Sequence, residues 1–436
     1  MKYYSTNGAT PQVSLKEAVI RGLAPDRGLY MPETIPQLPK EFFQNISKLS
    51  LQEIAYAAAL PIFGQDIEPE TLKSLIYESL NFDIPLVHVD GEINSLELFH
   101  GPTAAFKDVG ARFMARVLAY FCRQDSDETV NVLVATSGDT GSAVANGFLG
   151  VAGVRVFVLY PKGKVSKIQE AQFTTLGQNI TALEVSGTFD DCQRLVKQAF
   201  LDAELNKAMR LSSANSINVA RFLPQMFYYY YAYAQLSAQC QELGKDLVVA
   251  VPSGNFGNIT AGLIAKRMGL PVKRFIAANN RNDIFLQYLL TGIYAPRPSV
   301  ATIANAMDVG EPSNFARVLD LYGKSHKAIC AEISGCSYND RQISETIADV
   351  FSRTGYLLDP HGATGYRALQ EQLAGGECGV FIETAHPAKF KGTVEAVIGR
   401  EIEIPDRLMK FLAGSKQTEP MTTDFDAFKK FLLSRI

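Results

Sequence analysis

The stretch Val130-Asn-Val-Leu-Val-Ala-Thr-Ser-Gly-Asp-Thr-Gly141 decides the fold class, because it joins an apolar run to a helical segment through a glycine-rich loop. Its first six residues are mainly apolar and β-branched, as in a buried strand, and residues 141–148 continue as a helix. The same order recurs in Leu247-Val-Val-Ala-Val-Pro-Ser-Gly-Asn-Phe-Gly257, where a helix is expected over 259–268. Strands that alternate with helices predict parallel sheets covered by helices.

The alternation extends along most of the chain, with further strands predicted at 154–160, 179–185 and 379–383. The predicted fold class is therefore α/β, with two open, mainly parallel sheets covered by helices and a mostly helical N-terminal region. The expected ranges are 1–95 for the N-terminal region, 96–129 and 215–400 for a large α/β domain, 130–214 for a smaller nested α/β domain, and 401–436 for a C-terminal tail.

The composition narrows the class of protein. The 436 residues carry a net charge of −3, which argues against a nucleic-acid-binding surface or a polybasic membrane patch. No run of 18 apolar residues and no apolar N-terminal segment occurs, so neither a transmembrane helix nor a signal peptide is expected. The six cysteines form no C-x-x-C pair and the five histidines do not cluster, so we expect reduced thiols and no metal site. We expect a cytoplasmic monomer or homodimer.

One lysine stands out by its surroundings. In His100-Gly-Pro-Thr-Ala-Ala-Phe-Lys-Asp108, Lys107 lies between a Gly-Pro turn and an amphipathic helix whose apolar side carries Phe113, Val117 and Phe121. A poorly solvated amine has a lowered pKa and can form a Schiff base with an aldehyde. A surface lysine at the start of a helix is the alternative interpretation of this fragment taken alone.

Three predicted strand ends carry groups that suit an anion or a polar ring. The N–H groups of the 136–142 loop, with the hydroxyls of Ser137 and Thr140, suit a carboxylate. In the 252–258 loop, Gly254 and Gly257 allow the backbone to approach a phosphate, and the two asparagines add donors. Thr384 follows a third strand. Each loop alone is more often an ordinary turn than a ligand site, but two anion sites and a candidate Schiff-base lysine together indicate a phosphorylated aldehyde, pyridoxal 5'-phosphate.

Seven segments also match the motifs of one enzyme family. They are Gly22–Pro32, His100–Asp108, Ala135–Gly141, Asn215–Arg221, Val251–Gly257, Asp308–Phe315 and Thr384–Lys389. On these motifs the chain resembles the threonine synthases, which are fold-type II pyridoxal-phosphate enzymes, over nearly its whole length. The lysine and glycine-loop motifs are shared with relatives such as threonine dehydratase. The combination of Phe-Lys-Asp, Asn-Ser-Ile-Asn and Ala-His-Pro-Ala-Lys-Phe is more specific.

The resemblance implies a reaction and a set of residues. O-phospho-L-homoserine and water would become L-threonine and phosphate, the last step of threonine biosynthesis, and Lys107 would hold the cofactor and transfer protons. The implied cofactor-binding residues are Lys107, Gly254, Asn255, Phe256, Gly257 and Asn258, with Thr384 at the pyridine nitrogen and Asp139 near the 3'-hydroxyl. Asp139 departs from the asparagine of other branches of the wider family. The implied substrate-binding residues are Ser137, Thr140 and Gly141 for the carboxylate and Asn215, Ser216 and Arg221 for the phosphate.

The sequence leaves several alternatives open. A fold-type II dehydratase would share Lys107 and both loops but would not need Arg221. A catalytically idle relative would bind a cofactor or phosphorylated amine without turnover, although such proteins usually lose the lysine or a loop. A dinucleotide-binding dehydrogenase is disfavoured, because no G-x-G-x-x-G opens a strand–helix–strand unit. His361 and His386 either border the site or serve the structure.

Overall fold

The structure is a computed structural model that describes residues 1–124 and 129–436, without the side chains of 237–243. These residues form two compact units. Unit 1 comprises Met1–Met1, Met31–Phe106 and Phe222–Glu403, and unit 2 comprises Lys2–Tyr30, Lys107–Arg221 and Ile404–Ile436. These units divide the chain at other residues than the expected ranges, since Lys2–Tyr30, Lys107–Arg221 and Ile404–Ile436 all belong to unit 2. Residues 125–128, at the end of the expected 96–129 segment, lie outside the described residues.

Unit 2 is built on a five-stranded, fully parallel sheet in the order β14-β8-β7-β6-β9. The strands are β6 (Val130–Ala135), β7 (Val154–Pro161), β8 (Ile180–Val185), β9 (Arg210–Ser213) and β14 (Glu419–Met421). Every residue of β6 is buried, as expected for a parallel strand covered on both faces. The short strands β1 (Lys2–Ser5) and β2 (Val13–Ser14) pair antiparallel elsewhere in this unit.

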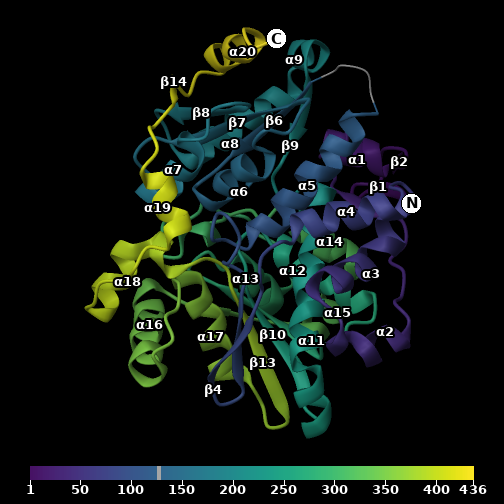
Figure 1. The fold of residues 1–436 in the computed structure, drawn as a ribbon, viewed down its shortest axis with the longest axis vertical. Coiled ribbons are helices and arrows are strands. Elements are labelled where there is room, and N and C mark those ends of the chain that lie inside the picture. Colours follow the sequence, from purple (N-terminus) through teal and green to yellow (C-terminus); the bar gives the residue numbers. More distant parts are fainter. Residues whose placement is uncertain (125–128) are drawn as a thin grey trace. The chain divides into compact units, whose positions relative to one another are not determined.

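The helices of unit 2 cover this sheet. They are α1 (Leu15–Arg21), α5 (Lys107–Cys122), α6 (Asp139–Phe148), α7 (Lys167–Thr174), α8 (Phe189–Leu201), α9 (Ala203–Ala208), α19 (Asp406–Leu412) and α20 (Phe425–Leu433). Thr188 and Asp191 form a capping box at the start of α8. Phe428 and Leu432 of α20 join the hydrophobic core that α8 forms with the sheet, and Figure 1 shows α20 beside α9. The C-terminal segment thus adds both a strand and a helix to the nested α/β fold.

Unit 1 contains a six-stranded sheet in the order β12-β11-β10-β13-β5-β4, in which only the β4–β5 pair is antiparallel. The strands are β4 (Leu86–Asp90), β5 (Ile93–Glu97), β10 (Asp246–Pro252), β11 (Arg274–Asn279), β12 (Ile333–Ser337) and β13 (Glu377–Glu383), with the short β3 (Tyr30–Pro32) at the boundary of the two units. The two mainly parallel sheets confirm the predicted α/β class.

The helices of unit 1 outnumber its strands. They are α2 (Lys40–Asn45), α3 (Leu51–Phe63), α4 (Pro69–Ser79), α11 (Met226–Leu243), α12 (Gly257–Arg267), α13 (Ile284–Thr291), α14 (Phe315–Leu321), α15 (His326–Glu332), α16 (Asp340–Thr354), α17 (Pro360–Gln372) and α18 (Lys391–Ile398), with α10 (Val219–Phe222) at the boundary. Four short 3-10 helices are η1 (Ile46–Lys48), η2 (Leu223–Gln225), η3 (Asn305–Met307) and η4 (Pro387–Phe390). In Figure 1, α17 lies along β10 and β13, and α16 packs on α17.

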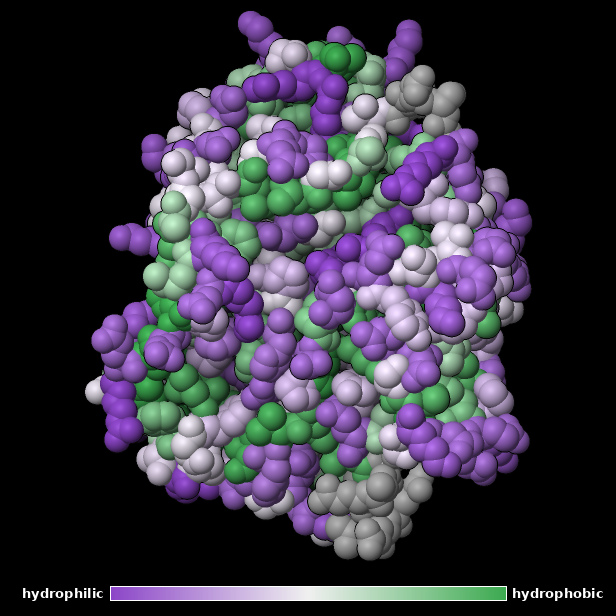
Figure 2. Space-filling view, viewed as in Figure 1, coloured by the Kyte–Doolittle hydropathy of each residue, from purple (hydrophilic) through white to green (hydrophobic). Residues whose placement is uncertain are grey.

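Three further features concern helix length, the surface and the cysteines. Among the described residues, no helix is long and apolar enough to cross a membrane. On the face seen in Figure 2, hydrophobic residues gather in patches between polar ones. Five of the six cysteines are free thiols, and the side chain of Cys240 lies outside the described residues.

Candidate active site

The loop that follows β10 is shaped to bind an anion through its backbone. Phe256 adopts a left-handed conformation (φ 63°) directly before α12, and its buried ring packs on Phe285 with the centroids 4.6 Å apart. Within the described part of the chain, the N–H groups of Gly254, Phe256, Gly257 and Asn258 donate to no protein acceptor. Free N–H groups at the start of a helix favour a bound phosphate.

The two asparagines of this loop hold its shape. Asn255 Oδ1 accepts from Ser313 N–H at 2.6 Å. Asn258 Nδ2 donates to the Pro252 carbonyl at 2.8 Å, and its Oδ1 accepts from Ile259 N–H at 2.9 Å. The Asn258 amide is therefore engaged within the protein, while its backbone N–H remains available.

Gly254 meets a close neighbour in the η3 turn. A Cβ atom on this residue would lie 2.8 Å from Met307 Cα and 3.0 Å from the Ala306 carbonyl oxygen. Both are backbone atoms, so a side chain here would push the loop and the turn apart. Only glycine fits at this point of the candidate phosphate site.

Thr384 lies at the neighbouring strand end. It follows β13, which pairs in parallel with β10, so both candidate groups lie at the carboxyl edge of one sheet, where α/β proteins bind ligands. Thr384 is buried, and its hydroxyl has no hydrogen-bond partner among the described residues. An unpaired hydroxyl on a buried residue at this edge fits the predicted contact with a ring nitrogen.

The segment before Lys107 is fixed to the segment that contains Thr384. Phe106 N–H donates to the Thr384 carbonyl at 2.8 Å, and His386 N–H donates to the Ala104 carbonyl at 3.1 Å. The ammonium of Lys389, a residue that is almost completely buried, donates to the Thr103 carbonyl at 2.8 Å. The motif Ala-His-Pro-Ala-Lys-Phe therefore holds the chain up to the residue that precedes Lys107.

Lys107 is the first residue of α5 and of the Lys107–Arg221 segment of unit 2, and it is half-buried. The helix buries the apolar side predicted from Phe113, Val117 and Phe121. The Lys107 carbonyl accepts from Arg221 Nη1 at 2.9 Å, and Arg221 Nε donates to the Ala214 carbonyl at 2.8 Å.

Arg221 is a buried cation in this arrangement. Burial lowers its pKa to about 10, and the nearby Asp108 carboxylate opposes that shift, so the guanidinium stays protonated at neutral pH. The predicted phosphate-binding Arg221 thus also ties the start of α5 to the loop that follows β9. In that loop, Asn215 Oδ1 is buried and has no hydrogen-bond partner among the residues that the structure describes.

The loop after β6 offers the second anion site. Ser137 and Thr140 are half-buried, and their hydroxyls have no partner among the residues described. Thr136 Oγ1 accepts from Gly138 N–H at 2.9 Å and from Gly141 N–H at 2.8 Å, so the Gly141 donor is used within the loop. β6 and β9 pair in parallel, so this loop and the Asn215 loop leave the same edge of the sheet.

Sequence reasoning missed residues that shape these loops. Thr136 is one, and Gln169 of α7 is another, because its Nε2 donates to the buried Asp139 carboxylate at 2.9 Å. The position of Thr136 before Ser137-Gly is a local signal for a turn, whereas the contact of Gln169 is long-range and has no sequence signal. Asp139 is therefore held by α7.

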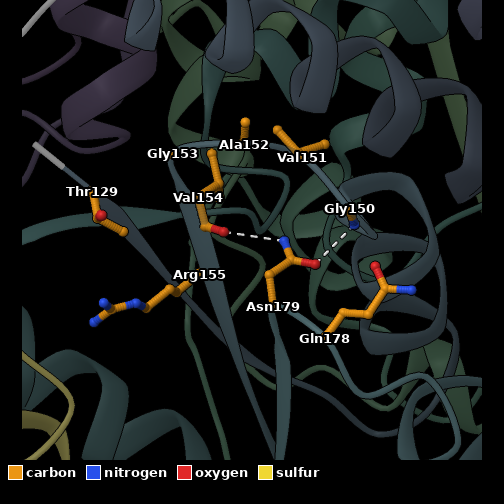
Figure 3. Close-up of a pocket in the computed structure, with 9 residues that line it drawn as sticks. All are labelled: Thr129, Gly150, Val151, Ala152, Gly153, Val154, Arg155, Gln178 and Asn179. Carbon is orange, nitrogen blue, oxygen red and sulfur yellow. Dashed lines mark hydrogen bonds between the residues drawn. The ribbon is translucent and has the colours of Figure 1, made fainter. Parts of the chain in front are cut away.

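A shallow hollow lies at the opposite edge of the sheet in unit 2. It is lined by Thr129, Gly150–Arg155, Gln178 and Asn179, next to the amino ends of β6, β7 and β8 (Figure 3). The Asn179 amide is already used there, since Nδ2 donates to Val154 and Phe148 carbonyls and Oδ1 accepts from Gly150 N–H. The Asn179 amide therefore joins the segments that line this hollow.

Known proteins match the chain over its whole length. The family models described as "Pyridoxal-phosphate dependent enzyme", "Threonine synthase N terminus" and "Threonine synthase, C-terminal" match residues 93–383, 2–80 and 362–432. The threonine synthase of Escherichia coli is 43% identical over 434 residues, which cover 100% of both chains. The crystal structure of threonine synthase from Escherichia coli matches with a TM-score of 0.93 at 42% identity, covering 100% of both chains. The PLP-bound threonine synthase from Brucella melitensis also gives 0.93, at 36% identity, covering 100% of this chain and 99% of that one.

Proposed function

Because the chain belongs to the threonine synthase family of pyridoxal-phosphate-dependent enzymes, we propose that it converts O-phospho-L-homoserine and water to L-threonine and phosphate. The observation that carries the proposal is the set of free N–H groups at Gly254, Phe256, Gly257 and Asn258, on a loop next to the strand that leads to Thr384. This donor set matches the phosphate of the family's cofactor.

In this proposal the unit 1 residues hold the cofactor. The backbone of Gly254–Asn258 binds its phosphate, and the Thr384 hydroxyl forms a hydrogen bond with its pyridine nitrogen. The bound cofactor supplies an electron sink for negative charge that develops on the substrate. A neutral hydroxyl cannot keep the ring nitrogen protonated as a carboxylate would, so more of the proton transfer falls to Lys107.

Lys107 carries the covalent and acid–base roles. Its amine would hold the cofactor through the cofactor aldehyde, and with substrate bound it would remove the Cα proton and transfer protons at Cβ and Cγ. The Arg221 contact with the Lys107 carbonyl supports this role, because it fixes the backbone from which the lysine side chain extends. Asp139, held by Gln169, is proposed to lie near the cofactor 3'-hydroxyl.

The remaining unit 2 residues are proposed to bind substrate. The hydroxyls of Ser137 and Thr140 bind the carboxylate at the start of α6, and Gly141, whose N–H donates to Thr136, shapes the loop that presents them. Asn215, Ser216 and Arg221 bind the phosphate that leaves from Cγ. A buried guanidinium neutralises charge on a leaving phosphate strongly, because little water screens it.

The proposal is tested by incubating purified protein and pyridoxal phosphate with O-phospho-L-homoserine. Threonine and phosphate should form in equal amounts. Bound cofactor without product would reject the substrate and leave the cofactor site standing. Serine and threonine should then be tried, because release of a keto acid from them would identify a dehydratase instead.

A further inference from the structure

A buried chain of acidic and imidazole groups lies at the start of α17. Asp359, His361 and Glu383 are all almost fully buried. Asp359 caps the helix, because its Oδ1 accepts from His361 N–H at 2.8 Å and its Oδ2 accepts from Gly362 N–H at 3.3 Å. His361 Nδ1 lies 2.5 Å from the same Oδ1. The helix N-terminus and the imidazole thus both stabilise the Asp359 carboxylate.

The other nitrogen of His361 reaches a different segment. Ala306 N–H donates to His361 Nε2 at 3.1 Å. A ring nitrogen that accepts a hydrogen bond carries no proton, so the single ring proton is on Nδ1 and is donated to Asp359. Asp359 therefore selects the tautomer in which His361 is an acceptor for Ala306.

Ala306 belongs to the turn that meets Gly254. The η3 turn Asn305–Met307 supplies the two backbone atoms that a Cβ on Gly254 would strike. Gly254, the first glycine of the candidate phosphate loop, thus packs against the turn in which the Ala306 N–H donates to His361. A shift of that turn would change the direction of the free N–H groups.

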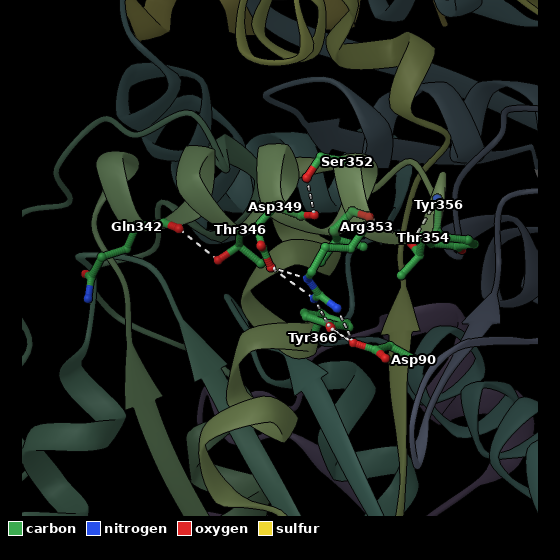
Figure 4. Close-up of polar contacts among 10 residues, drawn as sticks. Asp90, Gln342, Thr346, Asp349, Ser352, Arg353, Thr354, Tyr356 and Tyr366 are labelled. Atoms are coloured by element: carbon green, nitrogen blue, oxygen red, sulfur yellow. Dashed lines mark hydrogen bonds and ion pairs between the residues drawn. The ribbon is translucent and has the colours of Figure 1, made fainter.

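Hydrogen bonds and an ion pair fix the two segments that His361 connects, the η3 turn and α17. At the far end of the turn, the Asp308 carboxylate accepts from Asn280 Nδ2 and from the Thr302 hydroxyl, each at 2.8 Å. Farther along α17, the Tyr366 hydroxyl and Arg353 of α16 both bind Asp90 at the end of β4 (Figure 4). His361 therefore bridges a fixed helix and a turn that is anchored on its other side.

The same series of hydrogen-bonded groups extends to the strand that leads to Thr384. Glu383 Oε1 accepts from Asp359 N–H at 2.6 Å, and Glu383 directly precedes Thr384. His361 thus belongs to a set of hydrogen bonds that starts next to one proposed cofactor contact, Thr384, and ends at Ala306, whose carbonyl packs closely against another, Gly254.

We propose that His361 is a positioning residue for the cofactor phosphate: it holds the Asn305–Met307 turn against Gly254 and so directs the N–H groups of the 254–258 loop. The inference rests on the proposed role of that loop. The competing interpretation is that His361 only fills the core, where its ring packs on Phe390 with the centroids 4.9 Å apart.

Two substitutions separate these roles. In His361→Asn the short amide donates to Asp359 but does not reach Ala306. In His361→Gln the longer side chain places a carbonyl oxygen close to the position of Nε2 and restores the acceptor. His326→Asn is the control, because His326 contacts the Tyr288 and Leu289 carbonyls of the same unit instead of the turn.

The measurement compares pyridoxal phosphate with pyridoxal, which lacks the phosphate. Dissociation constants for both are determined by equilibrium dialysis with the full-length apoenzyme. His361→Asn should weaken pyridoxal phosphate binding about tenfold, the usual effect of one lost hydrogen bond, and leave pyridoxal binding unchanged. His361→Gln should recover most of the loss, and His326→Asn should resemble the original protein.

The outcomes distinguish the positioning role of His361 from the phosphate-binding role of the 254–258 loop. Equal weakening of both ligands in His361→Asn, or of neither, would overturn the positioning role. If His361→Asn does not fold, a tenfold phosphate-specific loss in a folded His361→Gln would overturn it as well. If the original protein binds pyridoxal phosphate no more tightly than pyridoxal, the phosphate role of the 254–258 loop itself fails.

Discussion

The N–H of Phe106 donates to the carbonyl of Thr384 across 2.8 Å, which joins the residue before Lys107 to the residue proposed to contact the cofactor ring. This hydrogen bond thus involves the backbone of Thr384 itself and of the residue directly before Lys107. Lys389 and the His386 backbone add two further hydrogen bonds to the same segment. The family motifs around Lys107 and Thr384 therefore depend on each other, because each segment supplies backbone partners to the other.

Lys107→Ala should abolish turnover and covalent cofactor attachment while the protein stays folded. Loss of the only proposed proton-transfer group is expected to lower kcat by at least about a thousandfold. Covalent attachment is checked by borohydride reduction followed by mass spectrometry. Lys164→Ala, at an exposed position of the same unit, is the control and should keep both properties. A folded and fully active Lys107→Ala enzyme would remove the proposed mechanism.

Gly254→Ala should weaken pyridoxal phosphate binding much more than pyridoxal binding. The added Cβ would strike the backbone at Met307 and Ala306, and the loop would have to move away from its present position. We expect at least a tenfold rise in the cofactor dissociation constant. Gly392→Ala is the control, because a Cβ in that exposed helical position meets no atom within 4 Å. It should raise the free energy of unfolding by about 0.5–1 kcal/mol. Unchanged cofactor binding in Gly254→Ala would contradict the tight packing at the η3 turn.

The main elements could be predicted from the sequence because their signals are local. The strand at 130–135 appears with the predicted bounds, and the helices that follow both glycine loops begin two residues earlier than predicted. The first turn of each helix is difficult to predict from the sequence, because the glycine-rich residues that form it have low helix propensity. The role of 419–421 as a strand was not predicted, because a three-residue segment carries no periodicity and depends on its partner β8.

The site could be predicted only in part. The residues of both loops were identified from glycines and hydroxyls next to strands, which are local features. The engagement of the Asn258 amide with Pro252, and of Arg221 with two carbonyls, follows from tertiary packing. The acceptor role of His361 likewise depends on Ala306, 55 residues away, for which the chain order gives no signal.

Arg221→Lys should separate substrate binding from cofactor binding. Lysine keeps the positive charge but cannot bind two carbonyls and a phosphate together, because it lacks the planar fork of arginine. We expect KM for O-phospho-L-homoserine to rise at least about tenfold while the dissociation constant of pyridoxal phosphate changes little. The free energy of unfolding should fall by about 1–3 kcal/mol, since one of the carbonyls of Ala214 and Lys107 loses its partner. Steady-state kinetics and cofactor titration are compared on one preparation. Equal losses in both would assign Arg221 to the cofactor site.

Glu383 and Glu377 lie at opposite ends of β13 and should respond to pH with opposite sign. Burial raises the pKa of Glu383 well above its ordinary value, and the neighbouring Asp359 adds to the shift. By contrast, the Arg274 guanidinium lowers the pKa of Glu377 to about 2. In the fold, Glu383 therefore keeps its proton to a higher pH than an ordinary glutamate does, whereas Glu377 is ionised near neutral pH.

Glu383→Gln should become more stable relative to the original protein as the pH rises above 4.5, the ordinary pKa of a glutamate. In that range the unfolded chain loses the Glu383 proton and the folded chain keeps it, so ionisation favours the unfolded state of the original protein only. The difference should grow by up to about 1.4 kcal/mol per pH unit until the raised pKa is reached. Urea unfolding at pH 5, 6 and 7 measures it. Glu377→Gln should show the reverse, a loss of stability at neutral pH that fades as the pH falls toward 2. If the free energies of unfolding of Glu383→Gln and of the original protein change equally with pH, Glu383 is ionised in the folded protein.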